Sequence, residues 1–186
     1  MILKKINSAL SLLTILGMLL HIGYTAFCYL TFYYNPVLKL IFSVPFMVTA
    51  CLHAILGMSV AFLQGDGTRL NLYPKQNRRT VLQRLSAALI FPMLILHLNT
   101  FNLMKTSVEA GQRALFVLLL LSEPLFFGTV LTHVATSFSN ALITLGWLSS
   151  RETQKTLDRI VYILCAAVFA VSVFAIIRGQ LVMFAG

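Results

Sequence analysis

Residues 114–148 read ALFVLLLLSEPLFFGTVLTHVATSFSNALITLGWL and contain one carboxyl, Glu123, and one histidine, His133. A helix needs about 20 predominantly apolar residues to cross a bilayer, so this stretch can span a membrane and project beyond it. Four more apolar segments accompany it. The sequence therefore predicts an all-α fold, an integral membrane bundle of five transmembrane helices. The five segments cover approximately residues 6–34, 37–64, 81–104, 114–148 and 160–184.

The overall composition is that of a membrane protein. Apolar residues make up 59% of the 186-residue chain and charged residues only 10%, whereas a soluble domain carries about 25% charged residues. The longest polar stretch, residues 65–80, contains no nucleotide-binding or peptidase motif. We therefore expect a single transmembrane domain over residues 1–186 that has no catalytic residues of its own.

The basic residues predict the orientation of the bundle. If the five segments are helices, ten of the fourteen Lys and Arg residues fall at one end, and Lys39, Lys105, Arg113 and Arg178 fall at the other. Cytoplasmic loops carry the excess of Lys and Arg. The chain should thus be a multi-pass protein of the cytoplasmic membrane, with its N-terminus inside and its C-terminus outside. This topology accounts for the net charge of +9 without a nucleic-acid partner.

The four histidines lie in four different apolar segments. They are His21, His53, His97 and His133. A histidine in lipid costs free energy unless it is partnered, so each is a functional candidate. A single one is more often bonded to a neighbouring helix, but one imidazole on each of four helices supplies the axial ligands of two bis-histidine haems. The three cysteines form no CxxCH motif, which favours haem b over covalently attached haem c.

Depth in the membrane predicts how the histidines pair. His21 and His97 follow the starts of their segments by about 15 and 16 residues, or roughly 22–24 Å of helix. His53 and His133 lie about 16 and 19 residues from the opposite ends of theirs, or roughly 24–28 Å. The expected pairs are therefore His21 with His97, nearer the outside, and His53 with His133, nearer the cytoplasm.

Two threonines could orient the second pair. Thr49 and Thr129 precede His53 and His133 by four residues each. A hydroxyl or carbonyl at that position can accept the imidazole Nδ1–H and fix the tautomer. The alternative is a threonine that bonds the backbone of its own helix.

The order and spacing of these residues resemble the two-haem, five-helix cytochrome b anchor of the succinate dehydrogenase and fumarate reductase family. The resemblance covers nearly the whole chain, although each motif is weak by itself. It is carried by Asn7-Ser8-Ala9 before His21, by His53-Ala54-Ile55-Leu56-Gly57-Met58, by Gln83 fourteen residues before His97, and by Leu145-Gly146-Trp147 after His133.

The resemblance implies the ligand pairing given above and a function in electron transfer. The chain would be the non-catalytic membrane subunit of a succinate:quinone oxidoreductase complex of the fumarate reductase type. It would hold two haems b and pass electrons between a membrane quinone, expected to be menaquinone, and partners on the cytoplasmic side. Those partners would be an iron-sulfur subunit and a flavoprotein subunit that contains FAD.

The resemblance also implies further site residues. Asn7, Ser8, Gln83 and Arg84 lie at or beside positions that meet the haem propionates, and an arginine can pair with a carboxylate bidentately. Three departures put the quinone site and any proton route in doubt. Asn140 and Thr144 stand where relatives often carry basic residues, Leu131 stands where some carry a membrane glutamate, and the turn at Asn35-Pro36 is too short for the acidic quinone-site residue found there in some relatives.

The quinone site and a proton route are expected near the outer end. Asn99 and Asn102 follow His97, and Glu123 is the one acid within an apolar stretch. Replacing Glu123 by Gln should then slow quinol turnover and leave both haems bound. If turnover were unchanged, the carboxyl would be structural and the site would be sought near Gln83 and Ser86.

Two other functions stay open. A cytochrome b of another quinone-linked dehydrogenase often takes two ligands from one helix, and no segment here has two histidines. A haem-free scaffold or carrier predicts polar groups in mid-membrane, and few occur besides the histidines, Glu123, Asn99 and Asn102. The colour of the purified protein would separate both redox functions from the haem-free one.

Overall fold

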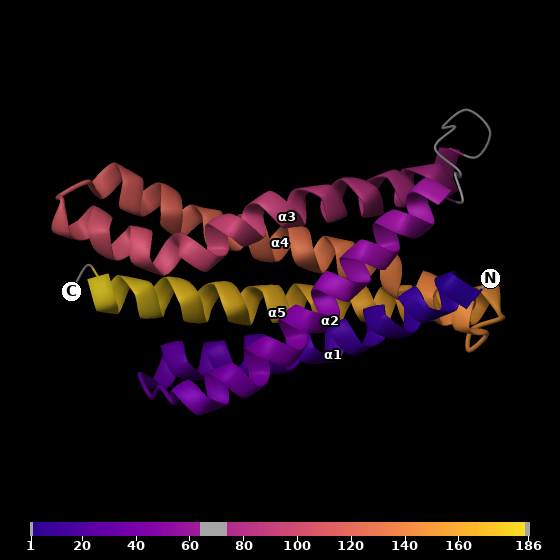
Figure 1. The fold of residues 1–186 in the computed structure, drawn as a ribbon, viewed down its shortest axis with the longest axis horizontal. Helices are drawn as coiled ribbons and strands as arrows, with labels where there is room; N and C mark the ends of the chain where they lie inside the picture. The colour runs from indigo at the N-terminus through magenta and orange to yellow at the C-terminus, as the bar shows by residue number, and fades with distance from the viewer. Residues whose placement is uncertain (1, 64–73, 185–186) are drawn as a thin grey trace.

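The computed structural model describes residues 2–63 and 74–184, and the side chains of residues 2–60 and 78–184. All regular structure in these ranges is helical (Figure 1). The helices are α1 (Ile2–Thr31), α2 (Pro36–Leu63), α3 (Pro74–Glu109), α4 (Arg113–Leu145) and α5 (Arg151–Phe184). Each of the five contains a segment long and apolar enough to cross a membrane. The expectation of five apolar helices is therefore confirmed.

Two helices begin at least seven residues earlier than expected from hydropathy, and α1 begins four residues earlier, at Ile2. α3 starts at Pro74 instead of residue 81, and α5 starts at Arg151 instead of residue 160. Proline is favoured in the first turn of a helix, where its missing N–H costs nothing. The polar residues of both first turns extend the helices past the apolar segments, so apolar length alone underestimates them. Part of the expected polar loop at residues 65–80 lies outside the described residues.

Helix α4 is the centre of the bundle. It packs against α1, α3 and α5, and it carries more buried residues than any other helix. Its aromatic residues Phe126 and Phe127 join Met18 and Ile22 of α1 and Ile176 of α5 in the main apolar cluster. The remaining faces expose many large apolar side chains, as lipid contact requires.

Helix α2 is packed on one side only. Among the described residues its backbone approaches α1 and no other helix, and none of its residues is fully buried. Gly17 permits the contact with α1, since a Cβ at that position would lie 3.3 Å from the Cα of Phe46. In Figure 1, α2 runs obliquely across the bundle towards the start of α3.

A short turn joins α1 and α2 and is fixed by side chains. Asn35 caps α2, because its Oδ1 accepts hydrogen bonds from the N–H groups of Val37 and Leu38. The Tyr24 hydroxyl donates to the Asn35 carbonyl at 2.7 Å and accepts from the Asn35 N–H at 2.9 Å. Arg178 of α5 donates to the carbonyl of Leu30 in the last turn of α1. These contacts hold the α1–α2 hairpin in register.

The two ends of the bundle are formed by different helix ends and turns, and they differ in their content of basic residues. The start of α1, the start of α3 and the α4–α5 turn lie at one end, here called the N-terminal end (Figure 1). The α1–α2 turn, the α3–α4 turn and the end of α5 lie at the other, the C-terminal end. All basic residues expected on the cytoplasmic side and described here belong to the N-terminal end. Arg69 and the side chain of Lys75 lie outside the description.

Candidate functional site: two pairs of histidines

His53 of α2 and His133 of α4 face each other near the N-terminal end. Their ring centroids are 6.3 Å apart and their planes are inclined by 58°. The backbones of α2 and α4 do not come into contact, so the two imidazoles bridge the space between these helices. This is one of the two pairs that similar depth predicts.

The ring of His133 is oriented by α3. Its Nδ1 lies 3.0 Å from the carbonyl oxygen of Gln83 and 3.3 Å from the hydroxyl of Ser86. A carbonyl can only accept, so the Gln83 contact places the imidazole proton on Nδ1 when the ring is neutral. The Nδ1 of His53, by contrast, is buried and has no hydrogen-bond partner among the described residues. A buried polar atom without a partner is rare in a completed site.

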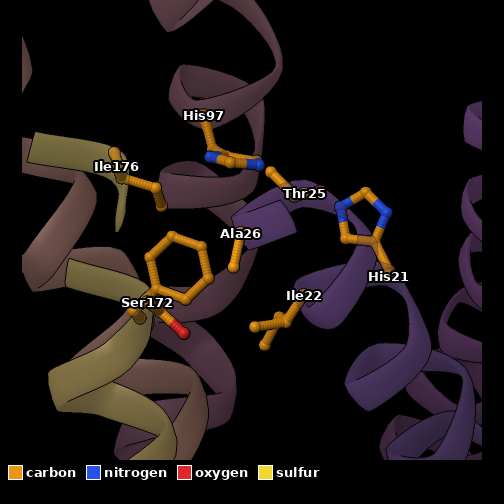
Figure 2. Close-up of a pocket in the computed structure, with 8 residues that line it drawn as sticks. His21, Ile22, Thr25, Ala26, His97, Ser172 and Ile176 are labelled. Carbon is orange, nitrogen blue, oxygen red and sulfur yellow. The ribbon is translucent and has the colours of Figure 1, made fainter. Parts of the chain in front are cut away.

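His21 of α1 and His97 of α3 form the second pair and share a small cavity. Ile22, Thr25 and Phe127 are among its other lining residues. Figure 2 shows the two rings approaching from different helices, with Thr25 between them in this view. The cavity measures about 20 Å³, which is room for about one water molecule. A planar macrocycle between these rings would require the intervening side chains to move aside.

Both rings of the second pair are also held through Nδ1. The Ser43 hydroxyl of α2 lies 3.1 Å from Nδ1 of His21, and Oε2 of Glu123 on α4 lies 2.8 Å from Nδ1 of His97. Aromatic rings cover the imidazole faces, with Phe46 stacked on His21 at 5.5 Å and Phe126 on His97 at 4.7 Å. The neighbouring helix therefore sets the orientation of each ring.

Three of the four histidines thus share one arrangement. His21, His97 and His133 each have Nδ1 bonded to a group on another helix, and the hydrogen bonds found for them among the described residues all go to Nδ1. Metal-binding histidines characteristically use one nitrogen for a carboxylate, carbonyl or similar partner and the other for the metal. Nε2 is therefore the nitrogen that each of these rings offers to a ligand.

The four residues expected at haem propionates lie near the His53–His133 pair. Ser8 is buried, and Oδ1 of Asn7 is buried without a partner in the described part of the chain. The Gln83 side chain accepts from the Asn140 amide at 3.4 Å, while its carbonyl holds His133. Arg84 is half-buried. Their contact with a propionate stays a prediction.

The residues expected at the quinone site are not gathered in one place. Asn99 is exposed and donates to the carbonyl of Ile95 on its own helix, and Asn102 is also exposed. Glu123 instead points inward to His97 and is only 3% exposed. The structure therefore brings Glu123 to a histidine and leaves the two asparagines on the surface of α3.

The threonines expected to orient the histidines have other partners. Thr49 donates to the carbonyls of Pro45 and Phe46, and Thr129 donates to the carbonyl of Leu125 and contacts Sδ of Met93. Both follow the alternative in which a threonine bonds its own helix. Ser86 of α3 contacts His133 in place of Thr129, whereas nothing among the described residues takes the place of Thr49 at His53.

Sequence reasoning missed an ion pair at the N-terminal end. Arg79 of α3 makes a bidentate contact with Asp158 of α5, at 2.8 and 3.0 Å. It also donates to the carbonyl of Thr136 and the hydroxyl of Ser139 on α4. This cluster ties three helices together one turn before Gln83, so it fixes the part of α3 that orients His133.

Comparisons of the chain with protein-family models, with curated proteins and with solved structures found no match. In the described residues no group of three or more His, Cys, Asp or Glu side chains gathers at one point. The donors that the fold brings together are the two pairs of imidazoles. Their geometry is the basis for the function proposed below.

Proposed function

We propose that this chain is a dihaem cytochrome b that anchors a quinone-linked oxidoreductase in the membrane. The observation that carries the proposal is the facing pair His53 and His133, 6.3 Å apart between two helices whose backbones do not touch. A packing contact between two helices would bring the backbones together. Two imidazoles that approach each other from helices without backbone contact are instead placed to share a ligand.

The spacing of this pair agrees with one iron between two imidazoles. Bonds between a metal and an imidazole nitrogen are about 2 Å long, so two nitrogens that held one iron between them would lie about 4 Å apart and the ring centres about 6 Å apart. The buried Nδ1 of His53 and the buried Oδ1 of Asn7, both without partners among the described residues, mark polar groups at this end that a bound group could complete. The residues present thus fit a haem b, which when bound supplies one-electron transfer.

The protein's contribution is to hold and orient the imidazoles. The Gln83 carbonyl and the Glu123 carboxylate keep His133 and His97 with Nε2 available. Arg79 and Asp158 brace the α3 turn that carries Gln83. Phe126 and Phe127 pack against the ring of His97. Rigid placement by neighbouring helices keeps the ligands in position as charge moves, which is what rapid electron transfer requires.

The proposal extends to topology and partners. The N-terminal end would be cytoplasmic, because it carries the excess of Lys and Arg. An iron-sulfur subunit and a flavoprotein of succinate dehydrogenase or fumarate reductase type would dock there, near the His53–His133 pair. Arg151, Lys155 and Arg159 are exposed at this end and would meet the partner. Quinone, expected to be menaquinone, would exchange electrons with the pair nearer the C-terminal end, where Glu123 is a candidate for proton handling.

The absorption spectrum of the purified full-length chain tests the proposal. The protein should be red, with the reduced-minus-oxidised spectrum of low-spin haem b. The variant in which His53 and His133 are both replaced by Ala should keep part of the absorbance, and replacement of all four histidines should abolish it. A colourless protein that is folded and helical by circular dichroism would contradict the proposal and favour a haem-free scaffold or carrier.

A further inference from the structure

A second feature of the bundle lies outside both histidine pairs. A groove of about 600 Å³ opens at the surface between α3, α4 and α5. Leu82, Leu85 and Leu89 form its α3 wall, Pro124 and Gly128 lie on its α4 floor, and Phe169 contributes from α5. Between the Arg79–Asp158 and Phe101–Phe184 contacts, the backbones of α3 and α5 approach each other at few positions, so α4 is left uncovered between them. A groove of this kind within a bilayer must be filled by a hydrocarbon.

The polar groups in the groove do not suit a quinone head group. Its hydroxyls belong to Ser86, Thr129 and Thr132. The Ser86 hydroxyl is 2.9 Å from the Gln83 carbonyl and 3.3 Å from His133, and the Thr129 hydroxyl donates to the Leu125 carbonyl. Quinone carbonyls need hydrogen-bond donors, and two of these three hydroxyl groups are already engaged inside the protein. The groove is therefore chemically matched to an alkyl chain.

The length of the groove fits one leaflet. Its α4 floor extends from Leu121 to Thr132, about 16 Å of helix. One leaflet contributes half of a hydrocarbon core that is about 30 Å thick. An acyl chain of ordinary length can therefore lie along the floor with its head group outside the groove.

An exposed basic residue lies at the end of the groove where the head group of a bound lipid would be. Arg78, Leu82, Leu85 and Leu89 follow one another at spacings of four, three and four residues, so they share one face of α3. Arg78 is exposed and forms no ion pair with any described residue, whereas its neighbour Arg79 is turned inward to Asp158. This row of leucines on α3 thus ends in the positive charge of Arg78, about 6 Å beyond Leu82 along the helix.

We propose that this groove binds an anionic phospholipid, with an acyl chain along α4 and its phosphate at Arg78. The proposal is independent of the haems, because no ligand histidine lines the groove. A basic residue at a membrane surface contributes about 1 kcal/mol towards anionic lipid, so the anionic lipid should be retained about fivefold better than a zwitterionic one.

Native mass spectrometry of the full-length protein in detergent tests the site. Phosphatidylglycerol and phosphatidylcholine with identical acyl chains are the probes. Leu89→Trp should fill the groove and abolish retention of phosphatidylglycerol. Leu98→Trp is the matched control on α3, because Leu98 is 60% exposed and does not line the groove. Leu85→Trp is a second filling variant, and circular dichroism checks that each variant is folded.

Charge variants test the head-group contact. Arg78→Ala should reduce retention of phosphatidylglycerol to the level of phosphatidylcholine, and Arg113→Ala, at the opposite end of the α3–α4 hairpin, should leave it unchanged. Undiminished phosphatidylglycerol retention in both folded tryptophan variants would overturn the proposal. The proposal would also be overturned if the wild-type protein retained an isoprenoid quinone in place of phospholipid and the Leu89→Trp variant did not. That result would show that the groove binds a quinone tail.

Discussion

Oε2 of Glu123 lies 2.8 Å from Nδ1 of His97, and the carboxyl is 3% exposed. The other two oriented rings meet neutral partners, the Gln83 carbonyl at His133 and the Ser43 hydroxyl at His21. A carboxylate that accepts the imidazole proton makes the ring a stronger electron donor than a neutral acceptor does. A haem between His21 and His97 would thus feel a negative charge that the other haem lacks.

Glu123→Gln should raise the reduction potential of the haem at the His21–His97 pair. The amide keeps the shape of the side chain but removes the charge that favours the oxidised iron, so we expect an upward shift of about 60 mV, equivalent to about 1.4 kcal/mol for one electron. Potentiometric titration measures it. Ser43→Ala removes only a neutral partner and should shift the potential less. An unshifted potential with slowed quinol turnover would instead assign Glu123 to the quinone site.

Single ligand variants should separate the two haems. His53→Ala should remove the haem proposed near the N-terminal end and stop electron transfer to the docked partner, because that haem would lie between the partner and the rest of the bundle. His21→Ala should remove the other haem and leave the first reducible. Potentiometric titration monitored by absorbance resolves the two centres. Loss of the same spectral component in both variants would show that the pairing is wrong.

Asp158→Asn should destabilise the bundle. Both side chains of the Arg79–Asp158 pair are about one-fifth exposed, and the contact is bidentate, so loss of the charge should cost about 1–2 kcal/mol. Thermal unfolding in detergent measures the change. Glu152→Gln is the control, because the Glu152–Lys155 pair is exposed on both sides and should contribute little. Equal unfolding temperatures for the two variants would show that the cluster does not brace α3.

Charge reversal at Arg151 and Arg159 should weaken docking of the soluble partners. Arg79 does not suit this test, because it is engaged with Asp158 and its reversal would disturb the fold. Both chosen residues are exposed, and rim charges act mainly through salt-dependent association. Co-purification at increasing ionic strength measures the effect. If insertion or topology is lost while docking is unaffected, these charges serve only to orient the chain in the membrane.

The sequence could predict the five helices and the two histidine pairs, since apolar length gives the number of spans and distance from the helix ends gives depth. It could also have predicted Ser43 and Glu123 as partners. Residue 21 lies ten residues before the end of α1 and residue 43 seven after the start of α2. Residue 97 lies twelve residues before the end of α3 and residue 123 ten after the start of α4, so each pair lies at a similar level by approximate symmetry about its turn. This symmetry was the available signal.

The Arg79–Asp158 cluster could not be predicted in the same way. α3 and α5 are not consecutive, and no turn sets their register, so the pairing depends on how both helices pack on α4. Apolar length also does not predict the polar first turns of α3 and α5, because these turns contain few apolar residues. The outward placement of Asn99 and Asn102 depends on the rotation of α3, which a helix with little amphipathic character does not reveal.

Haem stoichiometry tests the central claim most directly. The full-length chain should give two haems b per polypeptide in a pyridine haemochrome assay with protein quantified by amino-acid analysis, because under this proposal each of the two pairs of imidazoles would bind one iron. Replacement of His133 by Ala should reduce the ratio to one. A ratio of one in the wild type, a spectrum of haem c, or a ratio that His133→Ala leaves unchanged would contradict the account.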